Sequence, residues 1–227
     1  MSVVATISIR VKYFPKGRPF SIKLFAEIGS RAAVGKALSR LVSAGELERV
    51  TRGIYMRPKV NQYAGRVRPS PSTVVKIIAK QNHETIQVHG AEAVRAFSLS
   101  TQMQTQPVFY TSGSSREIRV GTSTVRLQHV APEKLQHAGT KTGLALTALF
   151  YLGKDGVNPF VVEKIKSKLT SSEFKQLTSS KIPMWLLTVL LANVEARVGA
   201  EIADEGGKPK RRLAIPEYRH LEECRHL

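Results

Sequence analysis

The chain has 227 residues, enough for one large domain or two small ones. Hydrophobic residues make up 42% of it and charged residues 23%, as in ordinary soluble folded proteins, so wholesale disorder is excluded. Lysine and arginine total 35 against 17 aspartates and glutamates, which gives a net charge of +18. Such an excess indicates a polyanionic partner, nucleic acid first and an acidic membrane surface second.

The cysteine count and the apolar runs indicate a cellular compartment. Cys224 is the only cysteine, which excludes an intrachain disulfide framework and a multi-cysteine metal site. The sequence begins without a basic leader followed by a long apolar run and a small-residue cleavage site. The longest apolar stretch, residues 184–194, has 11 residues, whereas a membrane span needs about 20. We therefore expect a soluble, cytoplasmic protein.

The positive charge is concentrated in the first third of the chain. Residues 1–68 hold 14 lysines and arginines against three acids, a net charge of +11. Residues 69–206 have a net charge of +4, and residues 207–227 a net charge of +3. A protein without a specialised basic surface would spread the excess evenly, so we expect the first third to bind nucleic acid. The alternative is a basic face that only meets solvent.

The first 29 residues predict two helices. Residues 3–14 place apolar side chains at helical spacing, although a strand-like alternation is also present. We favour the helix. After a turn at residues 16–19, the apolar residues Phe20, Leu24, Phe25 and Ile28 share one helical face. Gly29 is expected to end this second, short helix.

A third helix is predicted over residues 30–44. Ser30 is placed to cap it, because its hydroxyl can accept from the amides of the first turn. Gly45 closes it. An apolar stripe runs along one side, formed by Val34, Ala37, Leu38, Leu41 and Val42. The other side has no acid and carries Arg31, Ala32, Lys36, Ser39, Arg40 and Ser43. A small, cationic face of this kind suits close approach to a phosphate backbone and to base edges.

Residues 46–58 predict a hairpin after this helix. Two short apolar segments flank the dipeptide Arg52-Gly53, which suits a tight turn. The cations on or beside the hairpin are Arg49, Arg52, Arg57 and Lys59. Two helices joined by a glycine-containing turn and followed by a basic hairpin are typical of a winged helix-turn-helix that binds DNA. The alternative is a small helical domain whose hairpin binds a protein.

Composition suggests two boundaries and three parts. Residues 60–72 and 205–212 are rich in proline, glycine or charge and lack apolar periodicity. We therefore expect a winged helix over residues 1–65, a second domain over residues 70–205 and a basic, flexible tail over residues 206–227.

The second domain is predicted to be α+β with a small antiparallel sheet and C-terminal helices. Strands are expected at 85–89, 107–111, 117–120 and 124–130. Helices are expected at 72–82 (capped by Ser72), 91–97, 142–152, 157–168, 171–179 and 183–198.

Sites for chemistry are scarce in the sequence. No glycine-rich phosphate loop and no His-Glu-x-x-His pair is present. The residues from His220 to His226 form only a weak metal-ligand set at the chain end, and Cys224 has no evident base. The serines of the 112–115 segment fit a turn better than a nucleophile. We expect no enzymatic activity, no metal and no cofactor.

Two blocks of sequence resemble the AbiE-type (AbiEi) antitoxin family of type IV toxin–antitoxin systems. The first is Ala37-Leu-Ser-Arg-Leu41 followed by Gly45-Glu-Leu-Glu-Arg-Val-Thr-Arg-Gly-Ile-Tyr55. The second contains Val88-His-Gly-Ala-Glu-Ala93, Leu99-Ser-Thr-Gln102, Val108-Phe-Tyr-Thr111, Gly113-Ser-Ser-Arg116 and Ile118-Arg-Val-Gly121. The resemblance covers roughly residues 1–155. It implies a winged helix that binds operator DNA and a second domain that carries the antitoxin activity.

Together these observations predict a repressor of its own operon that counteracts a nucleotidyltransferase-like toxin, the toxin being implied by the resemblance alone. Base edges and phosphates would be contacted from the 30–44 helix by Arg31, Lys36, Ser39 and Arg40, and from the hairpin by Arg49, Arg52 and Arg57. Outer phosphate contacts would come from Lys12, Lys16 and Arg18. The alternatives are a regulator in a mobile element without a toxin, and an RNA-binding or enzymatic protein. The few aromatic residues, 7% of the chain and expected mostly in the core, argue against stacking on single strands.

Overall fold

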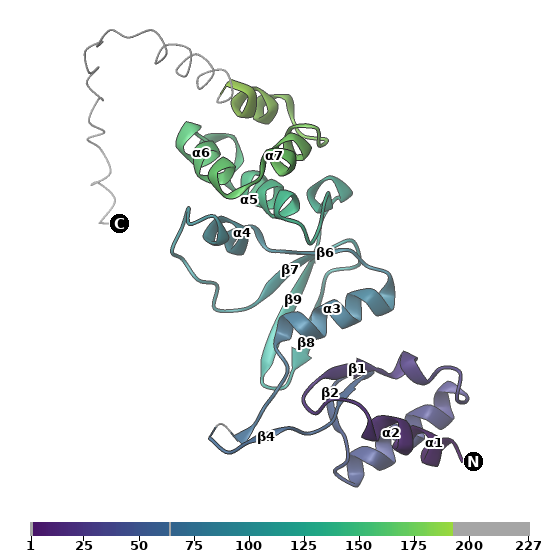
Figure 1. The fold of residues 1–227 in the computed structure, drawn as a ribbon. Helices are drawn as coiled ribbons and strands as arrows, with labels where there is room; N and C mark the ends of the chain where they lie inside the picture. The colour runs from purple at the N-terminus through teal and green to yellow at the C-terminus, as the bar shows by residue number, and fades with distance from the viewer. Residues whose placement is uncertain (1, 64, 193–227) are drawn as a thin grey trace, which may run out of the picture.

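The structure, a computed structural model, describes residues 2–63 and 65–192 (Figure 1). Within these residues the fold is mixed α+β, with helices and small sheets that are mainly antiparallel. The predicted tail (206–227), the second boundary (205–212), the set from His220 to His226 with Cys224, and the last six residues of the helix predicted at 183–198 lie outside the described residues.

The amino-terminal unit joins helices to a three-stranded sheet. Its elements in chain order are α1 (Val3–Lys12), β1 (Pro19–Ser21), the 3-10 helix η1 (Ile22–Phe25), α2 (Arg31–Ser43), β2 (Glu48–Thr51) and β3 (Ile54–Met56). The strands lie in the order β1-β3-β2, and both pairings are antiparallel. The edge strand β1 therefore brings the start of the chain beside the hairpin.

The helix predicted at 3–14 is confirmed as α1. The Ser2 hydroxyl accepts from the amide of Ala5 and caps the helix. Ile7 and Val11 are buried and face the core shared with α2. Their spacing of four residues, about one helical turn, fits the helix rather than the strand that the alternation also allowed.

The short helix predicted for residues 20–28 is wrong in its first part. Phe20 belongs to strand β1 and lies opposite Tyr55 in β3. The amide of Ile22 then donates to the carbonyl oxygen of Gly53 at 2.9 Å, and a 3-10 turn follows. Phe20 and Phe25 are buried as expected. The prediction of which residues are buried is therefore correct, but the assignment of all of them to one helix is wrong. Gly29 does not have a left-handed backbone; Val3 packs against it instead.

Helix α2 forms as predicted. The Ser30 hydroxyl accepts from the amide of Ala33, and Gly45 follows the helix with a φ of +74°. Its apolar stripe is buried at Val34, Ala37, Leu38 and Leu41, and Val42 is half-buried. The stripe packs on α1, Phe25 and Tyr55 in one hydrophobic core.

The three-stranded sheet is covered on both faces. Tyr55 lies in the core with α1 and α2, and its neighbours Ile54 and Met56 must point to the other face because side chains alternate along a strand. Both are buried. On that other face Val50 of β2 packs against a cluster that includes Val75 of helix α3 (Pro71–Asn82) and strands of the second sheet. The two parts of the chain therefore share a packed interface.

The segment at 60–72, where a boundary was predicted, contains a small antiparallel ribbon. Strands β4 (Val60–Asn61) and β5 (Gly65–Arg66) pair, and the amide of Val67 donates to the carbonyl oxygen of Lys59. Helix α3 follows the ribbon. Its cap is Ser70 and not Ser72: the Ser70 hydroxyl accepts from the amide of Thr73, and Pro71 takes the first helical position.

A second sheet is built from β6 (Ile86–Val88), β7 (Val108–Thr111), β8 (Arg116–Val120) and β9 (Ser123–His129). The predicted strands exist, but the sheet is not fully antiparallel. Its order is β6-β7-β9-β8, and β7 and β9 run parallel. The β8–β9 hairpin inserts β9 beside β7, so strands that follow each other in the chain are not all neighbours. Helix α4 (Gly90–Ala96) confirms the helix predicted at 91–97.

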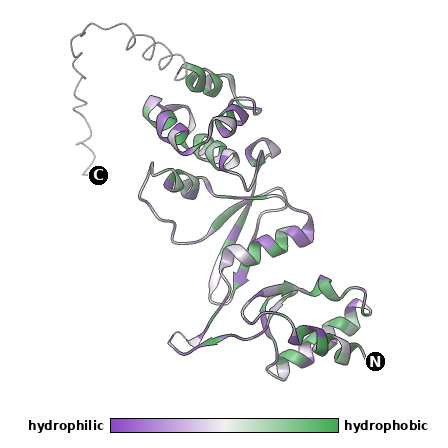
Figure 2. Ribbon diagram, in the orientation of Figure 1, coloured by the Kyte–Doolittle hydropathy of each residue, from purple (hydrophilic) through white to green (hydrophobic). Residues whose placement is uncertain are grey.

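The carboxyl-terminal part of the described chain is helical. After the 3-10 helix η2 (Pro132–Leu135) come α5 (Lys141–Gly156), α6 (Pro159–Lys168), α7 (Ser171–Thr178) and a helix over residues 184–192. This last helix, mostly hydrophobic in Figure 2, buries Leu186 and Leu190 in the core of α4 to α7. Met184 and Leu191 of this helix are exposed. None of the described helices combines the length and the apolar character that crossing a membrane requires.

Candidate nucleic-acid interface

The outward side of α2 carries cations and small polar residues. Arg31, Lys36, Ser39 and Arg40 are all exposed, as are Ala32 and Ser43. Except for Arg31, they lie away from the buried stripe, because 3.6 residues per turn put residues 32, 36, 39, 40 and 43 about a third to half a turn from Val34 and Leu41; Arg31 lies in the first turn at the side of the stripe. All four α2 residues predicted to face DNA are therefore accessible.

These cations are not neutralised by neighbouring side chains. The helix contains no aspartate or glutamate. Within residues 2–63 and 65–192 the ion pairs join Arg95 to Glu92, Arg116 to Glu84, and Lys181 to Glu133. None of them involves α2. An unpaired cationic helix face of this kind leaves its full charge for a polyanion.

Arg52 lies at the same end of the unit as the start of α2. It is exposed in the two-residue turn between β2 and β3, where Gly53 has a φ of +78°. Ile22 bonds to Gly53 through the backbone and also lines a small recess together with Arg31 and Val34. The hairpin turn and the first turn of α2 are thus brought together by η1.

Lys12, Lys16 and Arg57 lie at the opposite end of the three-stranded sheet. The register pairs Ser21 with Ile54 at the end near Arg52, and Pro19 with Met56 at the other end. Gly53 and Arg57 are four residue steps apart on either side of β3, roughly 13 Å. The predicted contacts therefore fall into two groups.

Arg57 has a structural contact that sequence reasoning did not foresee. It is half-buried, and its Nη1 donates to the carbonyl oxygens of Lys12 at 2.6 Å and Phe14 at 2.9 Å. The guanidinium thus ties the end of α1 to the end of β3. Lys12 and Lys16 are exposed beside it, and the amide of Gly17 donates to the carbonyl oxygen of Arg57 at 2.8 Å.

Of the two remaining predicted residues, Arg49 lies apart from both groups, whereas Arg18 adjoins the group of Lys16 and Arg57, because it precedes Pro19, the first residue of β1. Arg49 is exposed in β2 and lines a shallow recess with Arg68 and Gly121 of the β8–β9 turn. Arg18 is exposed at the mouth of a larger cavity beside α3.

The β4–β5 ribbon adds basic residues that the sequence analysis did not use. Lys59, Arg66 and Arg68 are exposed on or beside it, and Tyr63 near its tip is 95% exposed. Tyr13, after α1, is 84% exposed. The expectation that aromatic residues lie mostly in the core does not hold for these two. The sequence signal for this hairpin is the pair of valines, Val60 and Val67, on either side of Gly65. The prolines that flank the segment favoured an irregular structure instead.

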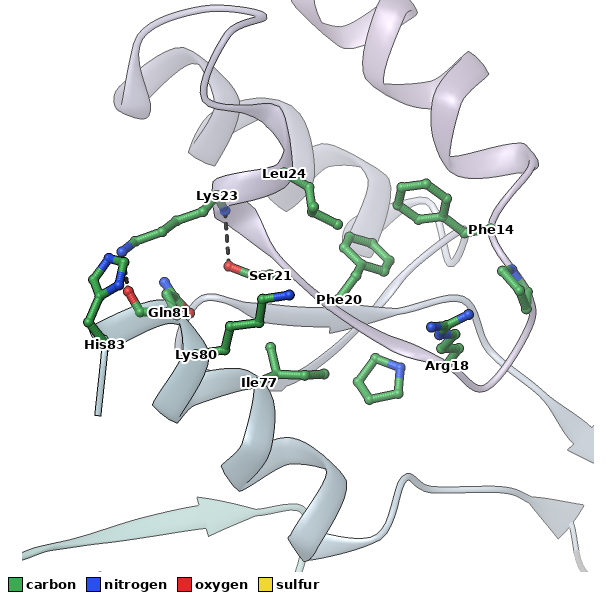
Figure 3. Close-up of a pocket in the computed structure, with 12 residues that line it drawn as sticks. Phe14, Arg18, Phe20, Ser21, Lys23, Leu24, Ile77, Lys80, Gln81 and His83 are labelled. Atoms are coloured by element: carbon green, nitrogen blue, oxygen red, sulfur yellow. Dashed lines mark hydrogen bonds between the residues drawn. The ribbon is translucent and has the colours of Figure 1, made fainter. Parts of the chain in front are cut away.

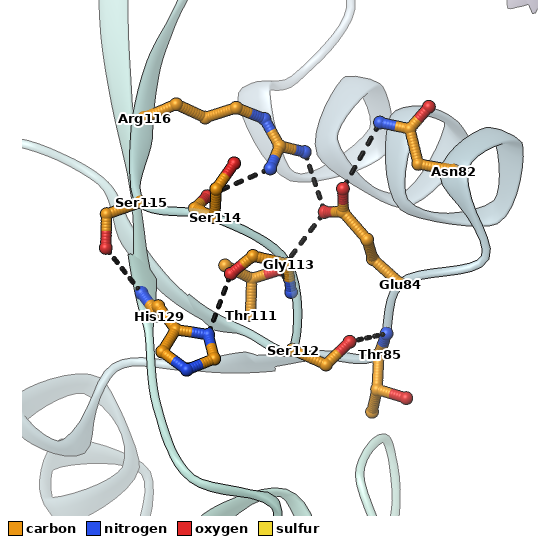
Figure 4. A network of polar contacts seen from close by, with 10 residues as sticks. All are labelled: Asn82, Glu84, Thr85, Thr111, Ser112, Gly113, Ser114, Ser115, Arg116 and His129. Atoms are coloured by element: carbon orange, nitrogen blue, oxygen red, sulfur yellow. Dashed lines mark hydrogen bonds and ion pairs between the residues drawn. The ribbon is translucent and has the colours of Figure 1, made fainter.

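The serine-rich loop between β7 and β8 is held by a dense polar network (Figure 4). The Ser112 hydroxyl accepts from the amide of Thr85, and the Ser115 hydroxyl accepts from the amide of His129, each at 2.9 Å. The His129 ring contacts the carbonyl oxygen of Gly113 through Nδ1, also at 2.9 Å, and not a serine hydroxyl. The geometry supports turn residues in this loop.

Glu84 anchors the same network. Its carboxylate pairs with Arg116 at 2.6 Å and accepts from the hydroxyl of Thr111 at 3.1 Å. Burial on its own raises the pKa of Glu84, but the hydrogen bonds from Arg116 and Thr111 and the positive charge of Arg116 outweigh it, so the pKa is lowered. No cluster of three or more metal-ligating side chains occurs in the part of the chain that the structure describes.

Comparison with known proteins gives one match. A family model described as "Family of unknown function (DUF6088)" matches residues 6–177, which include both sheets and all elements from α2 to α6. No curated protein sequence matches the chain.

Proposed function

The chain belongs to DUF6088, a family of unknown function, and we propose from its residues that it is a DNA-binding transcriptional autorepressor. From its resemblance to the AbiE-type family we propose that it is also an antitoxin. Residues 2–63 bind operator DNA as a winged helix, and the second domain counteracts a nucleotidyltransferase-like toxin. Both steps take place in the cytoplasm.

The order of elements in the amino-terminal unit supports the winged helix. A helix, an edge strand, a short helix, a capped helix and a two-stranded hairpin follow one another, and the edge strand pairs with the second strand of the hairpin. In this arrangement α2 is the helix that enters the major groove, and the Arg52 turn is the wing beside it.

The observation that carries the proposal is the unpaired cationic face of α2. Lys36 and Arg40 are exposed on a helix without acids, and both are free of ion pairs within the described residues. Arg31 and Arg52 extend this face at its amino-terminal end. An arginine that reaches a guanine in the major groove discriminates by about 1–3 kcal/mol against another base.

Selection of bound duplexes from random DNA, compared with the gene's own upstream region, tests the operator. Arg40→Ala is expected to weaken binding to the selected site by about 1–3 kcal/mol and to relax its specificity. Arg52→Ala is expected to weaken all duplexes alike, because a turn cation contacts phosphate. Lys154→Ala, which removes an exposed cation of α5, is the matched control and should leave binding unchanged.

A salt series tests the contact itself. If about five phosphates are contacted, log K falls with log salt with a slope of about −4.5. A duplex affinity that does not respond to salt would contradict the proposal.

The antitoxin part of the proposal rests on the resemblance of the 88–121 block to the AbiE-type family. We expect a gene for a nucleotidyltransferase-type protein beside this one. Expression of that neighbour alone should arrest growth, and co-expression of the full chain should relieve the arrest. The Arg40→Ala variant should relieve it equally well, because the proposed operator-binding helix is a separate surface. If no such neighbour exists, the protein is a regulator without a toxin, as in a mobile element.

Single-stranded nucleic acid is a second candidate partner, favoured by the exposed rings of Tyr13 and Tyr63 on a basic unit. Competition between a duplex and a single strand of equal length at fixed salt separates the two. Preference for the single strand, lost in Tyr63→Ala, would replace duplex binding as the conclusion.

A further inference from the structure

A cavity of about 580 Å³ lies between the amino-terminal unit and α3 (Figure 3). One wall comes from the segment between α1 and η1, and the other from the last turns of α3 and from His83. Its volume falls in the range typical of small-molecule sites, roughly 300–1,000 Å³. The proposed operator contacts on α2 do not line it.

The floor of the cavity is apolar and partly aromatic. The rings of Phe14 and Phe20 meet edge to face, with centroids 4.9 Å apart and planes at 70°. Leu24 and Ile77 complete this floor from η1 and α3. Leu24 is half-exposed at the cavity. A flat apolar ring is the ligand shape that such walls accept best.

The rim of the cavity is cationic. Arg18, Lys23 and Lys80 lie around the opening, and no aspartate or glutamate is among the lining residues. The Lys23 ammonium donates to the carbonyl oxygen of Gln81, which fixes it at the junction of η1 and α3. Arg18 and Lys80 are exposed and have no ion pair within the described residues. Their charge favours an anionic group at the rim.

We infer that this cavity binds a small aromatic carboxylate, with the ring on Phe14, Phe20 and Ile77 and the carboxylate between Arg18 and Lys80. The ligand would contact both the amino-terminal unit and α3. It would therefore stabilise the folded chain, by an amount that rises with the logarithm of its concentration once the site is largely occupied. This inference does not depend on duplex binding.

Calorimetric titration of the full chain with 2-naphthoate tests the inference. We expect saturable binding at one site and a rise in Tm with ligand concentration. The neutral analogue 2-naphthylmethanol should bind at least about tenfold more weakly, because it keeps the ring but lacks the charge. Equal affinity for the two compounds would overturn the anionic part of the assignment.

Two variants of α3 form a matched pair for this titration. Lys80→Glu reverses a rim charge and should weaken 2-naphthoate about tenfold, whereas Lys76→Glu reverses an exposed charge that does not line the cavity and should change it less than twofold. Ile77→Trp fills the floor and should abolish binding of both compounds. Equal effects of the two charge reversals would overturn the inference.

The cations at the rim of the cavity could instead contact the phosphates of the duplex. If 2-naphthoate shows no saturable binding and Lys80→Glu weakens duplex binding more than Lys76→Glu, the rim belongs to the duplex interface and the inference is overturned. Normal duplex binding by Lys80→Glu together with loss of 2-naphthoate supports it. Because these readouts are separate, failure of the ligand site and failure of the operator proposal are distinguishable.

Discussion

His89 is a titratable residue used as a helix cap. Its Nδ1 accepts from the backbone amide of Ala91 at the start of α4 and lies 2.7 Å from the side-chain Nε2 of Gln104. Its ring packs against the rings of Tyr110 and Tyr151. Burial lowers the pKa of His89, because the charged imidazolium loses solvation. Protonation of Nδ1 would also remove the acceptor that caps the helix.

The lowered pKa of His89 predicts a dependence of stability on acid. The unfolded chain binds a proton at His89 near pH 6.5, above the folded pKa, so the contribution of neutral His89 is present above pH 6.5 and lost as the pH falls through the folded pKa. His89→Asn keeps a strong cap but does not titrate. Urea unfolding at pH 7.5 and pH 5.5 should therefore show a smaller loss of stability in the variant. An unchanged loss would assign the effect to other groups.

Gly90 packs so closely that any side chain would collide with its neighbour. A Cβ atom there would lie 2.3 Å from Cβ and ring atoms of Tyr151. We expect Gly90→Ala to destabilise the fold by about 1–3 kcal/mol, measured by urea unfolding. Gly35→Ala in α2 is the control, because nothing lies within 4 Å of a Cβ atom added there. Replacing a glycine inside a helix by alanine should raise the free energy of unfolding by about 0.5–1 kcal/mol. Similar effects of both substitutions would contradict the steric argument.

At this scale the sequence identified residue types better than contacts. The exposure of Lys36 and Arg40 followed from their spacing against Val34 and Leu41. The carbonyl contacts of Arg57 could not be foreseen, because they join residues 43 to 45 positions apart in the chain. Long-range polar contacts depend on how elements pack, and periodicity carries no information about that.

Among the elements, α2 depends on a cap that can be separated from its proposed binding face. Ser30→Ala removes the hydroxyl that accepts from Ala33 and should cost about 1 kcal/mol of stability. Ser39→Ala changes an exposed residue of the same helix and should leave stability within about 0.5 kcal/mol. Chemical denaturation measures both. Duplex affinity should fall more in Ser39→Ala than in Ser30→Ala. A larger loss of affinity in Ser30→Ala would show that Ser39 does not belong to the interface.

Elements with strong local signals were predicted, whereas β1 and the parallel pairing in the second sheet, which depend on long-range pairing, were not. The capped, periodic helices α2, α6 and α7 match their predictions closely. Strand β1 was missed because its three residues become a strand only by pairing with β3. The parallel pair of β7 and β9 was missed because neighbours in sequence were taken to be neighbours in the sheet.

For the molecule as a whole, the two predicted domains are less independent than the composition suggested. Val50 of the amino-terminal sheet packs with α3 and the second sheet, and Ile54 and Met56 are buried on the same side. Charge and composition suggested a boundary between the two parts, but they did not show that the parts share apolar surface. We expect thermal unfolding to be a single cooperative transition for both parts.

A charge placed in this shared surface tests how much the surface contributes to stability. Val50→Asp puts a carboxylate among apolar side chains and should destabilise the chain by about 2 kcal/mol or more, with both parts unfolding together. Val60→Asp introduces the same charge at an exposed site in β4 and should remain within about 0.5 kcal/mol. Calorimetry distinguishes the outcomes: two separate transitions in Val50→Asp would show that each half folds alone.

A three-stranded sheet with apolar side chains on both surfaces has a practical consequence for anyone who wishes to cut the molecule. A fragment that stops before α3 would expose Ile54, Met56 and Val50 to water, and such a patch invites self-association. The amino-terminal unit, the proposed operator-binding end, is therefore poorly suited to transplantation onto another protein. Any fusion or truncation that is meant to keep it monomeric has to retain α3 as its cover.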